Sequence, residues 1–297
     1  MFFCTVFFTN LKFFFNVFLS LLYRGWKMLD LKRYTTIRLL GEGGFARVHL
    51  VVDEVTGEEY ALKELIPQED EVSHLQNLEK LLMEFTLLVA LPQHSNVVRV
   101  FETDFKNGYL MEAFGASLTK NIHLVGKFRH LIQIMMGIFQ GLNHFHQNGK
   151  LHLDVKPSNV LISRDQYGNI QVKLTDPLVL GKDKSLFFGT SEYAAPEFMA
   201  YVGGDSPKAD MFAAGIIFYQ LLFGSFRSDP WGVRHDSDAS KFYDFRFNRK
   251  PRSLKIKWPE EIRQLIAELL SHRPKKRPDA SSCIERLKPF LEEEDKE

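Results

Sequence analysis

The pattern of apolar and polar positions divides the chain into three parts. Residues 1–22 are strongly apolar, with a charged side chain only at Lys12. Between residues 34 and 111, short runs that favour β-strands are separated by polar or glycine-rich turns. From about residue 117 onward, apolar residues mostly recur at three- and four-residue spacing, which predicts helices. The pattern therefore predicts an α+β chain in which the strands come first and the helices follow.

The individual elements follow from the same pattern. The expected strands are 35–40, 48–52, 60–63, 97–101 and 108–111, with a further strand at 170–174. The expected helices are 75–91, 128–147, 208–223, 259–271 and 279–293. Residues 225–252 show no clear period, and neither an internal repeat nor a second domain is evident.

The first 22 residues leave two alternatives open. As a helix they would span about 33 Å, which is enough to cross a bilayer core. Insertion is opposed by Lys12, at roughly 2.5–3.5 kcal/mol near the centre, and by two asparagines. If the segment inserts, Arg24 and Lys27 favour a cytoplasmic position for the rest of the chain. The other alternative is that residues 1–27 are a leader, or are not part of the working protein.

Composition narrows the class of protein. The 297 residues provide ample sequence for a packed core, and the formal net charge of +1 gives no electrostatic reason to expect nucleic acid as a partner. The two cysteines, Cys4 and Cys283, lie at opposite ends of the chain. They suggest neither a disulfide framework nor a zinc site, which fits a reducing compartment.

The acidic residues at 292–297 predict a solvated tail.

An octet from His152 to Asn159 carries the chemistry that the sequence suggests. Asp154 could accept the proton of a hydroxyl, and Lys156 could neutralise a transferring phosphoryl group. Asn159, together with Asp176 at the end of the strand 170–174, offers hard oxygen ligands of the kind that Mg²⁺ prefers. The H-x-D-x-K-P-x-N pattern with a following acid resembles the catalytic and metal-binding loops of eukaryotic protein kinases.

A glycine-rich turn before residue 48 strengthens this resemblance. Glycines let backbone N–H groups approach phosphate oxygens. The spacing to Val48 and to Lys63 resembles the kinase G-x-G-x-x-G-x-V and V-A-I-K pair. In the resemblance, Lys63 reaches the α- and β-phosphates, Met111 lies at the back of the nucleotide pocket, and the connector 112–114 reads adenine. The implied nucleotide-binding residues are Gly41, Glu42, Gly43, Gly44, Phe45, Ala46, Val48, Ala61, Lys63, Glu84, Met111, Glu112 and Phe114.

The ammonium group of Lys63 needs an acidic partner from the helix 75–91. Glu84 is the first choice and Glu79 the second. Glu84 stands ten positions before His94, one more than is usual in the family, so Pro92 and Gln93 look like a local insertion. The alternative role of Glu84 is a solvated helix charge. After the connector, Gly115 is expected to provide a flexible exit.

Three departures from the family pattern affect the expected activity. Ala46 replaces the third glycine of the loop, which would tighten the approach of phosphate. Leu153 replaces the arginine that, in the family, pairs with a phosphate on the activation segment, so no phosphorylation is expected to be required there. Pro177 and Leu178 replace Phe-Gly after Asp176, which predicts a stiffer metal-binding loop. Asp176 itself is retained, so metal binding remains chemically possible.

Two further motifs resemble architectural parts of the family. Residues 189–197 match its G-T-x-x-Y-x-A-P-E segment, in which Thr190 would contact Asp154 and Lys156. Ser185 and Thr190 are the hydroxyl candidates of the short activation segment. By resemblance, Glu197 pairs with Arg277. The second motif is the segment 208–215, in which Asp210 would hold the backbone of the catalytic loop. The histidines at 144 and 146 are expected to be structural.

The resemblance covers residues 34–291 and implies a two-lobed protein-kinase-like fold. The small five-stranded lobe is expected at 34–111, the hinge at 112–116 and the larger helical lobe at 117–291, with ATP and Mg²⁺ between the lobes. The implied function is serine/threonine protein kinase activity, in which the γ-phosphate of ATP is transferred to a protein hydroxyl. The runner-up is a weak or inactive pseudokinase that binds nucleotide or acts as a scaffold. A small-molecule kinase is disfavoured by the match at 189–197.

Overall fold

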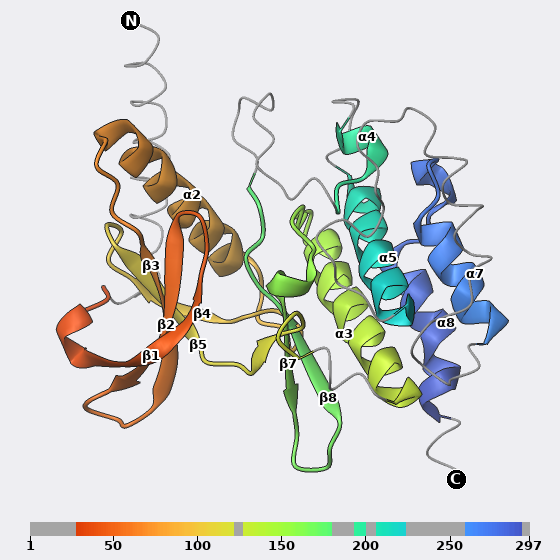
Figure 1. The fold of residues 1–297 in the computed structure, drawn as a ribbon, viewed down its shortest axis with the longest axis horizontal. Coiled ribbons are helices and arrows are strands. Elements are labelled where there is room, and N and C mark those ends of the chain that lie inside the picture. Colours follow the sequence, from red (N-terminus) through yellow and green to blue (C-terminus); the bar gives the residue numbers. More distant parts are fainter. Residues whose placement is uncertain (1–27, 122–126, 180–192, 200–205, 224–258, 293–297) are drawn as a thin grey trace, which may run out of the picture. The chain divides into compact units, whose positions relative to one another are not determined.

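The chain divides into two compact units in a computed structural model (Figure 1). The structure describes residues 28–121, 127–179, 193–199, 206–223 and 259–292. The first unit comprises Met1–Ala90 and Arg99–Ala113, and the second comprises Leu91–Val98 and Phe114–Glu297. The chain therefore leaves the first unit for residues 91–98 and then returns to it. The predicted small lobe at 34–111 had included those eight residues.

The first unit is built on an antiparallel sheet of five strands in the order β1-β2-β3-β5-β4. Its elements are β1 (Tyr34–Glu42), β2 (Ala46–Asp53), β3 (Glu59–Leu65), α2 (Glu71–Ala90), β4 (Val100–Thr103) and β5 (Gly108–Glu112). Residues directly opposite each other in such a sheet share a face. Lys63 is paired with Val48 on one side and with Tyr109 on the other, so these three side chains lie on the same face.

The other face of this sheet is covered by a short segment that precedes β1. The 3-10 helix η1 (Leu31–Arg33) follows Leu29, whose backbone N–H donates to the carbonyl of Thr103 over 3.1 Å. The side chain of Leu29 is 6% exposed and packs in an apolar cluster with Val51, Leu62 and Leu110. Arg33 ends the segment and binds the buried carboxylate of Asp53 through both side-chain oxygens. This hydrogen-bonded guanidinium holds the pKa of the Asp53 carboxyl well below its usual range.

The second unit is mainly helical and carries a small three-stranded sheet in the order β6-β7-β8. Its elements are β6 (Ala116–Ser117), α3 (Phe128–Gln147), η3 (Pro157–Asn159), β7 (Val160–Arg164), β8 (Ile170–Leu174), α4 (Pro196–Met199), α5 (Pro207–Phe223), α7 (Glu260–Leu269), η4 (Pro274–Lys276) and α8 (Ala280–Glu292). In α5, each of the residues from Ala209 to Leu221 is buried, which explains why this helix has no polar face. The ring of Phe218 on α5 packs edge-on against that of Phe139 on α3, with centroids 4.9 Å apart.

Two local expectations differ from the structure. The strand expected at 97–101 begins only at Val100, because the N–H of Val98 donates to the carbonyl of Leu174 over 3.0 Å. Helix α2 begins at Glu71, four residues early. The side chain of Asp70 accepts hydrogen bonds of 3.0 Å from the N–H groups of Val72 and Ser73, as N-terminal caps do.

Gly115, the expected flexible exit from the connector, packs closely against β7, and its flexibility stays a prediction. Its φ angle is +39°, and a Cβ atom at this position would lie 2.0 Å from the carbonyl oxygen of Ile162. Glycine is therefore needed at this position for close packing against β7 and for a backbone angle that other residues resist.

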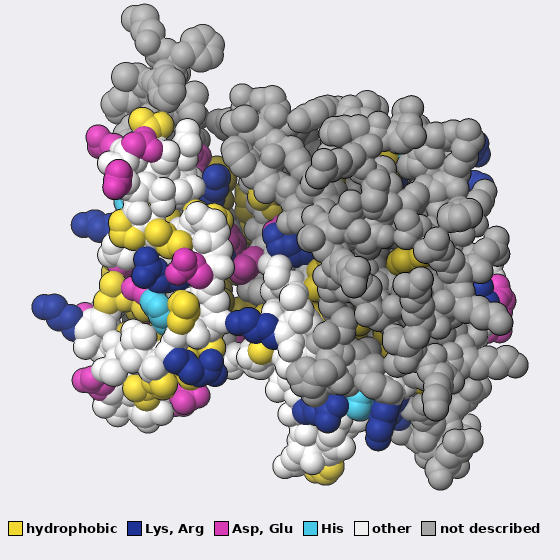
Figure 2. All heavy atoms as spheres, in the orientation of Figure 1, with side chains coloured by type: hydrophobic (Ala, Val, Ile, Leu, Met, Phe, Trp, Pro, Cys, Tyr) yellow, Lys and Arg dark blue, Asp and Glu magenta, His cyan; other side chains and the backbone are white. Residues whose placement is uncertain are grey.

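Surface and terminal features add little to the fold. On the face drawn in Figure 2, basic and acidic side chains of the first unit are interspersed. Among the described residues, no helix has the length and apolar character needed to cross a membrane. The predicted anchor at residues 1–22 and the tail beyond Glu292 lie outside the described residues.

Candidate active site

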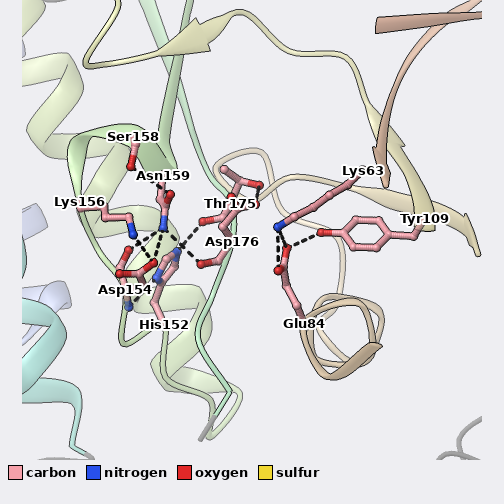
Figure 3. A network of polar contacts seen from close by, with 10 residues as sticks. All are labelled: Lys63, Glu84, Tyr109, His152, Asp154, Lys156, Ser158, Asn159, Thr175 and Asp176. Carbon is pink, nitrogen blue, oxygen red and sulfur yellow. Dashed lines mark hydrogen bonds and ion pairs between the residues drawn. The ribbon is translucent and has the colours of Figure 1, made fainter. Parts of the chain in front are cut away.

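The first unit brings together a lysine, a glutamate and a tyrosine from three different elements (Figure 3). Lys63 on β3 places its ammonium nitrogen 2.8 Å from each carboxylate oxygen of Glu84 on α2. The hydroxyl of Tyr109 on β5 donates to Oε1 of the same carboxylate. All three residues are at most 5% exposed. The carboxylate beside Lys63 is thus that of Glu84, the first choice from the sequence, and it is not a solvated helix charge.

Several residues predicted to bind nucleotide share one face of the sheet in the first unit. Ala61 is paired with Met111 in the same register that pairs Lys63 with Tyr109 and with Val48. These side chains line the face that also carries the ammonium of Lys63. At the end of β5, the N–H of Glu112 donates to the carbonyl of Arg99 over 2.9 Å. Phe114 belongs to the second unit, where the ammonium of Lys173 lies 5.3 Å from its ring centroid.

The glycine-rich turn connects β1 and β2. The N–H of Gly43 donates to the carbonyl of Ala46 over 2.8 Å, which closes the turn. The Ala46 side chain is 5% exposed and takes part in the ladder between β2 and β3. The ring of Phe45 lies 5.6 Å from the ammonium of Lys63 and 5.9 Å from that of Lys80. An effect of Ala46 on phosphate approach stays a prediction.

The loop 152–159 of the second unit, which is the predicted catalytic loop, is held by Asp210 on α5. The carboxylate of Asp210 accepts hydrogen bonds from the backbone N–H of His152 at 3.0 Å and of Leu153 at 2.7 Å. It also lies 2.9 Å from Nε2 of His146 on α3. Leu153 has a φ angle of +57°, a conformation that leucine rarely adopts. Asp210 therefore fixes a strained backbone just before Asp154, and His146 has the structural role expected of it.

Asp154 is oriented by two neighbours in the same loop (Figure 3). Its Oδ2 atom lies 2.7 Å from the ammonium of Lys156. The side-chain amide of Asn159 donates to the same oxygen and to the backbone carbonyl of Asp154, in both cases over 2.9 Å. The side chains of Asp154 and Lys156 are 17% and 24% exposed, so solvent reaches both. The loop thus presents a fixed, accessible carboxylate next to a cation.

His152 connects this loop to the end of β8. Burial lowers the pKa of His152, so the neutral ring is favoured. Its Nε2 lies 3.0 Å from the carbonyl of Thr175, while Nδ1 lies 3.3 Å from the N–H of Asp154. A neutral ring satisfies both contacts if Nε2 donates and Nδ1 accepts. The ring therefore couples the position of Asp154 to the residue that precedes Asp176.

Asp176 and Asn159 form an oxygen-rich site in the second unit. Asp176 has a φ angle of +57°, and its carbonyl accepts from the Asn159 amide over 3.4 Å. The hydroxyl of Thr175 donates to the Asp176 carboxylate over 3.0 Å. Carboxylate and amide oxygens suit Mg²⁺, which binds few protein ligands and completes its shell with phosphate and water. Among the described residues, no cluster of three or more His, Cys, Asp or Glu side chains is suited to a metal.

The substitutions after Asp176 are accommodated without strain at leucine. Pro177 is buried, and the N–H of Leu178 donates to the carbonyl of His152 over 2.7 Å. The positive φ angle falls on Asp176, and Leu178 is not among the described residues that have one. The loop is therefore attached to the catalytic loop by a backbone hydrogen bond.

The expected pair of Glu197 and Arg277 is present in the second unit. The guanidinium of Arg277 binds the two carboxylate oxygens of Glu197 over 2.6 and 2.8 Å. Arg277 is 1% exposed and also donates to the carbonyls of Ser271 and Lys208. Ser185 and Thr190, the predicted hydroxyl candidates, lie outside the described residues.

Sequence reasoning missed Tyr109 as a member of the Lys63 cluster. A tyrosine at a buried strand position reads as a core residue, and only its register opposite Lys63 reveals its hydroxyl as a partner of Glu84. A correct alignment of β3 with β5 could have found it.

Comparison with known proteins assigns the family. The sequence model of the family described as protein kinase domain matches residues 34–287 of this chain. The chain belongs to the protein kinase domain family. The α+β, two-lobed kinase-like fold predicted from the sequence is thereby confirmed for this kinase domain, whose first unit has the expected five-stranded sheet.

Relatives of the kinase domain carry serine/threonine kinase names. The meiosis-specific serine/threonine-protein kinase mek1 of Schizosaccharomyces pombe is 31% identical over 276 residues, which cover 84% of this chain and 57% of that protein. The CBL-interacting serine/threonine-protein kinase 19 of Arabidopsis thaliana is 28% identical, with coverage of 84% and 51%. The probable serine/threonine-protein kinase PLK of Dictyostelium discoideum is 28% identical, with coverage of 86% and 26%. The chain thus spans between about a quarter and three-fifths of the length of these relatives.

Proposed function

We propose that this kinase domain transfers the γ-phosphoryl group of ATP to serine or threonine hydroxyls of a protein substrate. The observation that carries the proposal is the arrangement around Asp154, whose carboxylate is accessible, is fixed by the Asn159 amide and lies 2.7 Å from the ammonium of Lys156. The serine/threonine kinase names of the relatives support the same class of acceptor.

The second unit supplies the groups for the hydroxyl and the metal. Asp154 orients the acceptor hydroxyl and takes its proton, while Lys156 offsets negative charge on the transferring group. Asn159 and Asp176 would hold Mg²⁺, which neutralises charge on the phosphate oxygens when it is bound. Both residues are already connected to the catalytic loop by the amide of Asn159. Little rearrangement of this loop is then needed for catalysis.

The first unit supplies the groups for the nucleotide. Lys63, held by Glu84, would bind the α- and β-phosphates, and the backbone of the glycine-rich turn would approach the phosphate oxygens. The shared face with Val48, Ala61 and Met111 is apolar apart from this cluster and would accommodate adenine. The connector 112–114, whose last residue Phe114 belongs to the second unit, would read its edge by backbone hydrogen bonds.

The alternative of an inactive scaffold rested on substitutions at 46, 153, 177 and 178. The backbone of the second unit argues for catalysis in spite of them. Leu153 is held by Asp210, and the N–H after Pro177 binds the catalytic loop. A domain that had lost catalysis would have no need for the Asp154, Asn159 and Asp176 arrangement.

Membrane anchoring by residues 1–22 and a cytoplasmic kinase domain stay predictions.

Phosphate transfer by the full chain tests the proposal. We expect γ-phosphate transfer from ATP with Mg²⁺ to a generic Ser/Thr protein substrate or to the chain itself. Asp154→Asn should lower kcat by roughly 10²- to 10⁴-fold, the usual contribution of a positioned base, and leave ATP binding nearly unchanged. Asp165→Asn is the matched control, because that carboxylate accepts from backbone N–H groups in the turn after β7 and an amide can replace it. Equal turnover in both variants would refute the assignment of Asp154.

A further inference from the structure

The hydroxyl of Tyr109 has a chemical role that the phosphate-binding residues do not explain. Glu84 is 5% exposed, and its carboxylate binds the ammonium of Lys63 through both oxygens. The Tyr109 hydroxyl donates to Oε1, so this oxygen accepts from two side chains that come from neighbouring strands (Figure 3). A hydrogen bond to a charged group is among the stronger ones in proteins, and burial strengthens it further.

The tyrosine also joins the helix to the sheet. Its backbone is opposite that of Lys63 in the β3–β5 ladder, and its ring packs against that of Phe85 on α2 with centroids 5.4 Å apart. Phe85 follows Glu84 directly in the helix. The ring and the hydroxyl of Tyr109 therefore contact two consecutive residues of α2, and Tyr109 itself is fully buried. An aromatic side chain with two rotatable bonds, packed in this way, can hold its hydroxyl in one place.

Lysine alone would hold Glu84 less firmly during a reaction. An ammonium is a point charge on a flexible stem, and contact with nucleotide phosphates would compete with its contacts to the carboxylate. A second donor on a rigid strand keeps the carboxylate oriented when Lys63 engages phosphate. Glu84 can then continue to direct the ammonium.

We propose that Tyr109 is a positioning residue for phosphoryl transfer, which fixes Glu84 and, through it, the ammonium of Lys63 before nucleotide binds. The inference rests on the proposed kinase function for its kinetic consequence, but the anchoring of α2 by the hydroxyl can be tested without activity. Tyr109 is not a catalytic residue in this scheme, since it contacts Glu84 and not the substrate.

The test compares Tyr109→Phe with Tyr60→Phe in the full chain. Tyr109→Phe keeps the ring against Phe85 and removes only the hydroxyl. Tyr60→Phe is the matched control, because it removes a hydroxyl that donates to the Glu58 carboxylate over 2.7 Å from the opposite face of the same sheet. Steady-state rates with varied ATP and varied protein substrate, melting temperature, and hydrogen–deuterium exchange over residues 81–88 of α2 are measured for each.

The expected result is specific to the Tyr109 variant. Its kcat/KM for ATP should fall about tenfold to a hundredfold, the range for loss of a hydrogen bond to a charged group, with the KM for protein substrate unchanged. Exchange in residues 81–88 should accelerate in Tyr109→Phe and not in Tyr60→Phe.

Two results would overturn the inference. Equal exchange of α2 in the two variants would show that the hydroxyl does not anchor Glu84, whether or not the chain transfers phosphate. Equal kcat/KM for ATP in an active wild-type chain and in Tyr109→Phe would show that the anchor has no consequence for the reaction. If the wild-type chain transfers no phosphate, the proposed function fails, and the exchange experiment still decides the role of Tyr109.

Discussion

Replacement of Glu197 by alanine should be among the most destabilising single changes in the second unit. The guanidinium of Arg277, 1% exposed, would lose two charge-assisted hydrogen bonds of 2.6 and 2.8 Å. It would keep the carbonyls of Ser271 and Lys208 and the ring of Phe212, which lies 4.8 Å from its central carbon. Removing one partner of a buried ion pair leaves an uncompensated charge and costs about 3–5 kcal/mol.

The retained carbonyls should place the loss of Glu197 near the lower end of that range, at about 3 kcal/mol. Glu197→Gln, which keeps one acceptor oxygen, should cost less. The measurement is urea unfolding of the full chain followed by circular dichroism, at 0.1 and 0.5 M salt. Because the Arg277 side chain is buried and that of Glu197 is only 13% exposed, added salt should change the difference very little.

The pair Glu260–Arg263 provides the matched control. Its atoms are 3.7 Å apart and its side chains are 79% and 45% exposed, so Glu260→Ala should change stability by no more than about 0.5 kcal/mol. A loss below about 1 kcal/mol for Glu197→Ala, or one equal to that of Glu260→Ala, would refute the reasoning that an unpaired Arg277 is expensive.

Two further predictions concern the N-terminal segment and pH. Leu29→Ala should destabilise the first unit by about 2–4 kcal/mol in the same urea assay, because Leu29 is 6% exposed, whereas Val55→Ala at a position 79% exposed should have almost no effect. A loss equal to that of Val55→Ala would show that the segment before β1 does not contribute to the core. Burial and the neighbouring His144 and Lys173 charges lower the pKa of His94, so the folded chain binds fewer protons than the unfolded chain. This part of the stability is present above the unfolded pKa of about 6.5 and is lost as pH falls through the folded pKa. Stability should therefore fall less steeply from pH 7 to pH 5 in His94→Gln than in the wild-type chain. An unchanged slope would contradict this prediction.

Sequence patterns predicted the parts of the molecule that depend on local spacing. Helix α3 has the bounds expected from its apolar period, and most of its residues between His130 and Phe145 are buried. The octet 152–159 follows a motif of characteristic spacing, and the pairing of Lys63 with Glu84 was anticipated although Glu84 stands one position farther from His94 than is usual in the family. These features depend on residues that lie close together in the sequence.

Features that depend on distant packing could not be predicted in this way. Leu29 precedes any periodic segment, and only the sheet face formed by three strands explains its burial. The predicted start of β4 was wrong because the N–H of Val98 donates a hydrogen bond to the carbonyl of Leu174, 76 residues later in the sequence. The close packing of Gly115 could not be predicted either, because a sequence does not show that the carbonyl of Ile162 leaves no room for a side chain there.

The buried proline after Asp176 has a consequence for compounds that would inhibit this domain. A ligand that inverts the backbone of residues 176–178 must break the hydrogen bond from the N–H of Leu178 to the carbonyl of His152 and move Pro177 out of its buried position. The ring of proline also restricts its φ angle to about −65°, which removes many of the backbone conformations that an inverted loop could use. Selective inhibitors of this chain should therefore be sought among ligands that bind without changing the backbone conformation of residues 176–178.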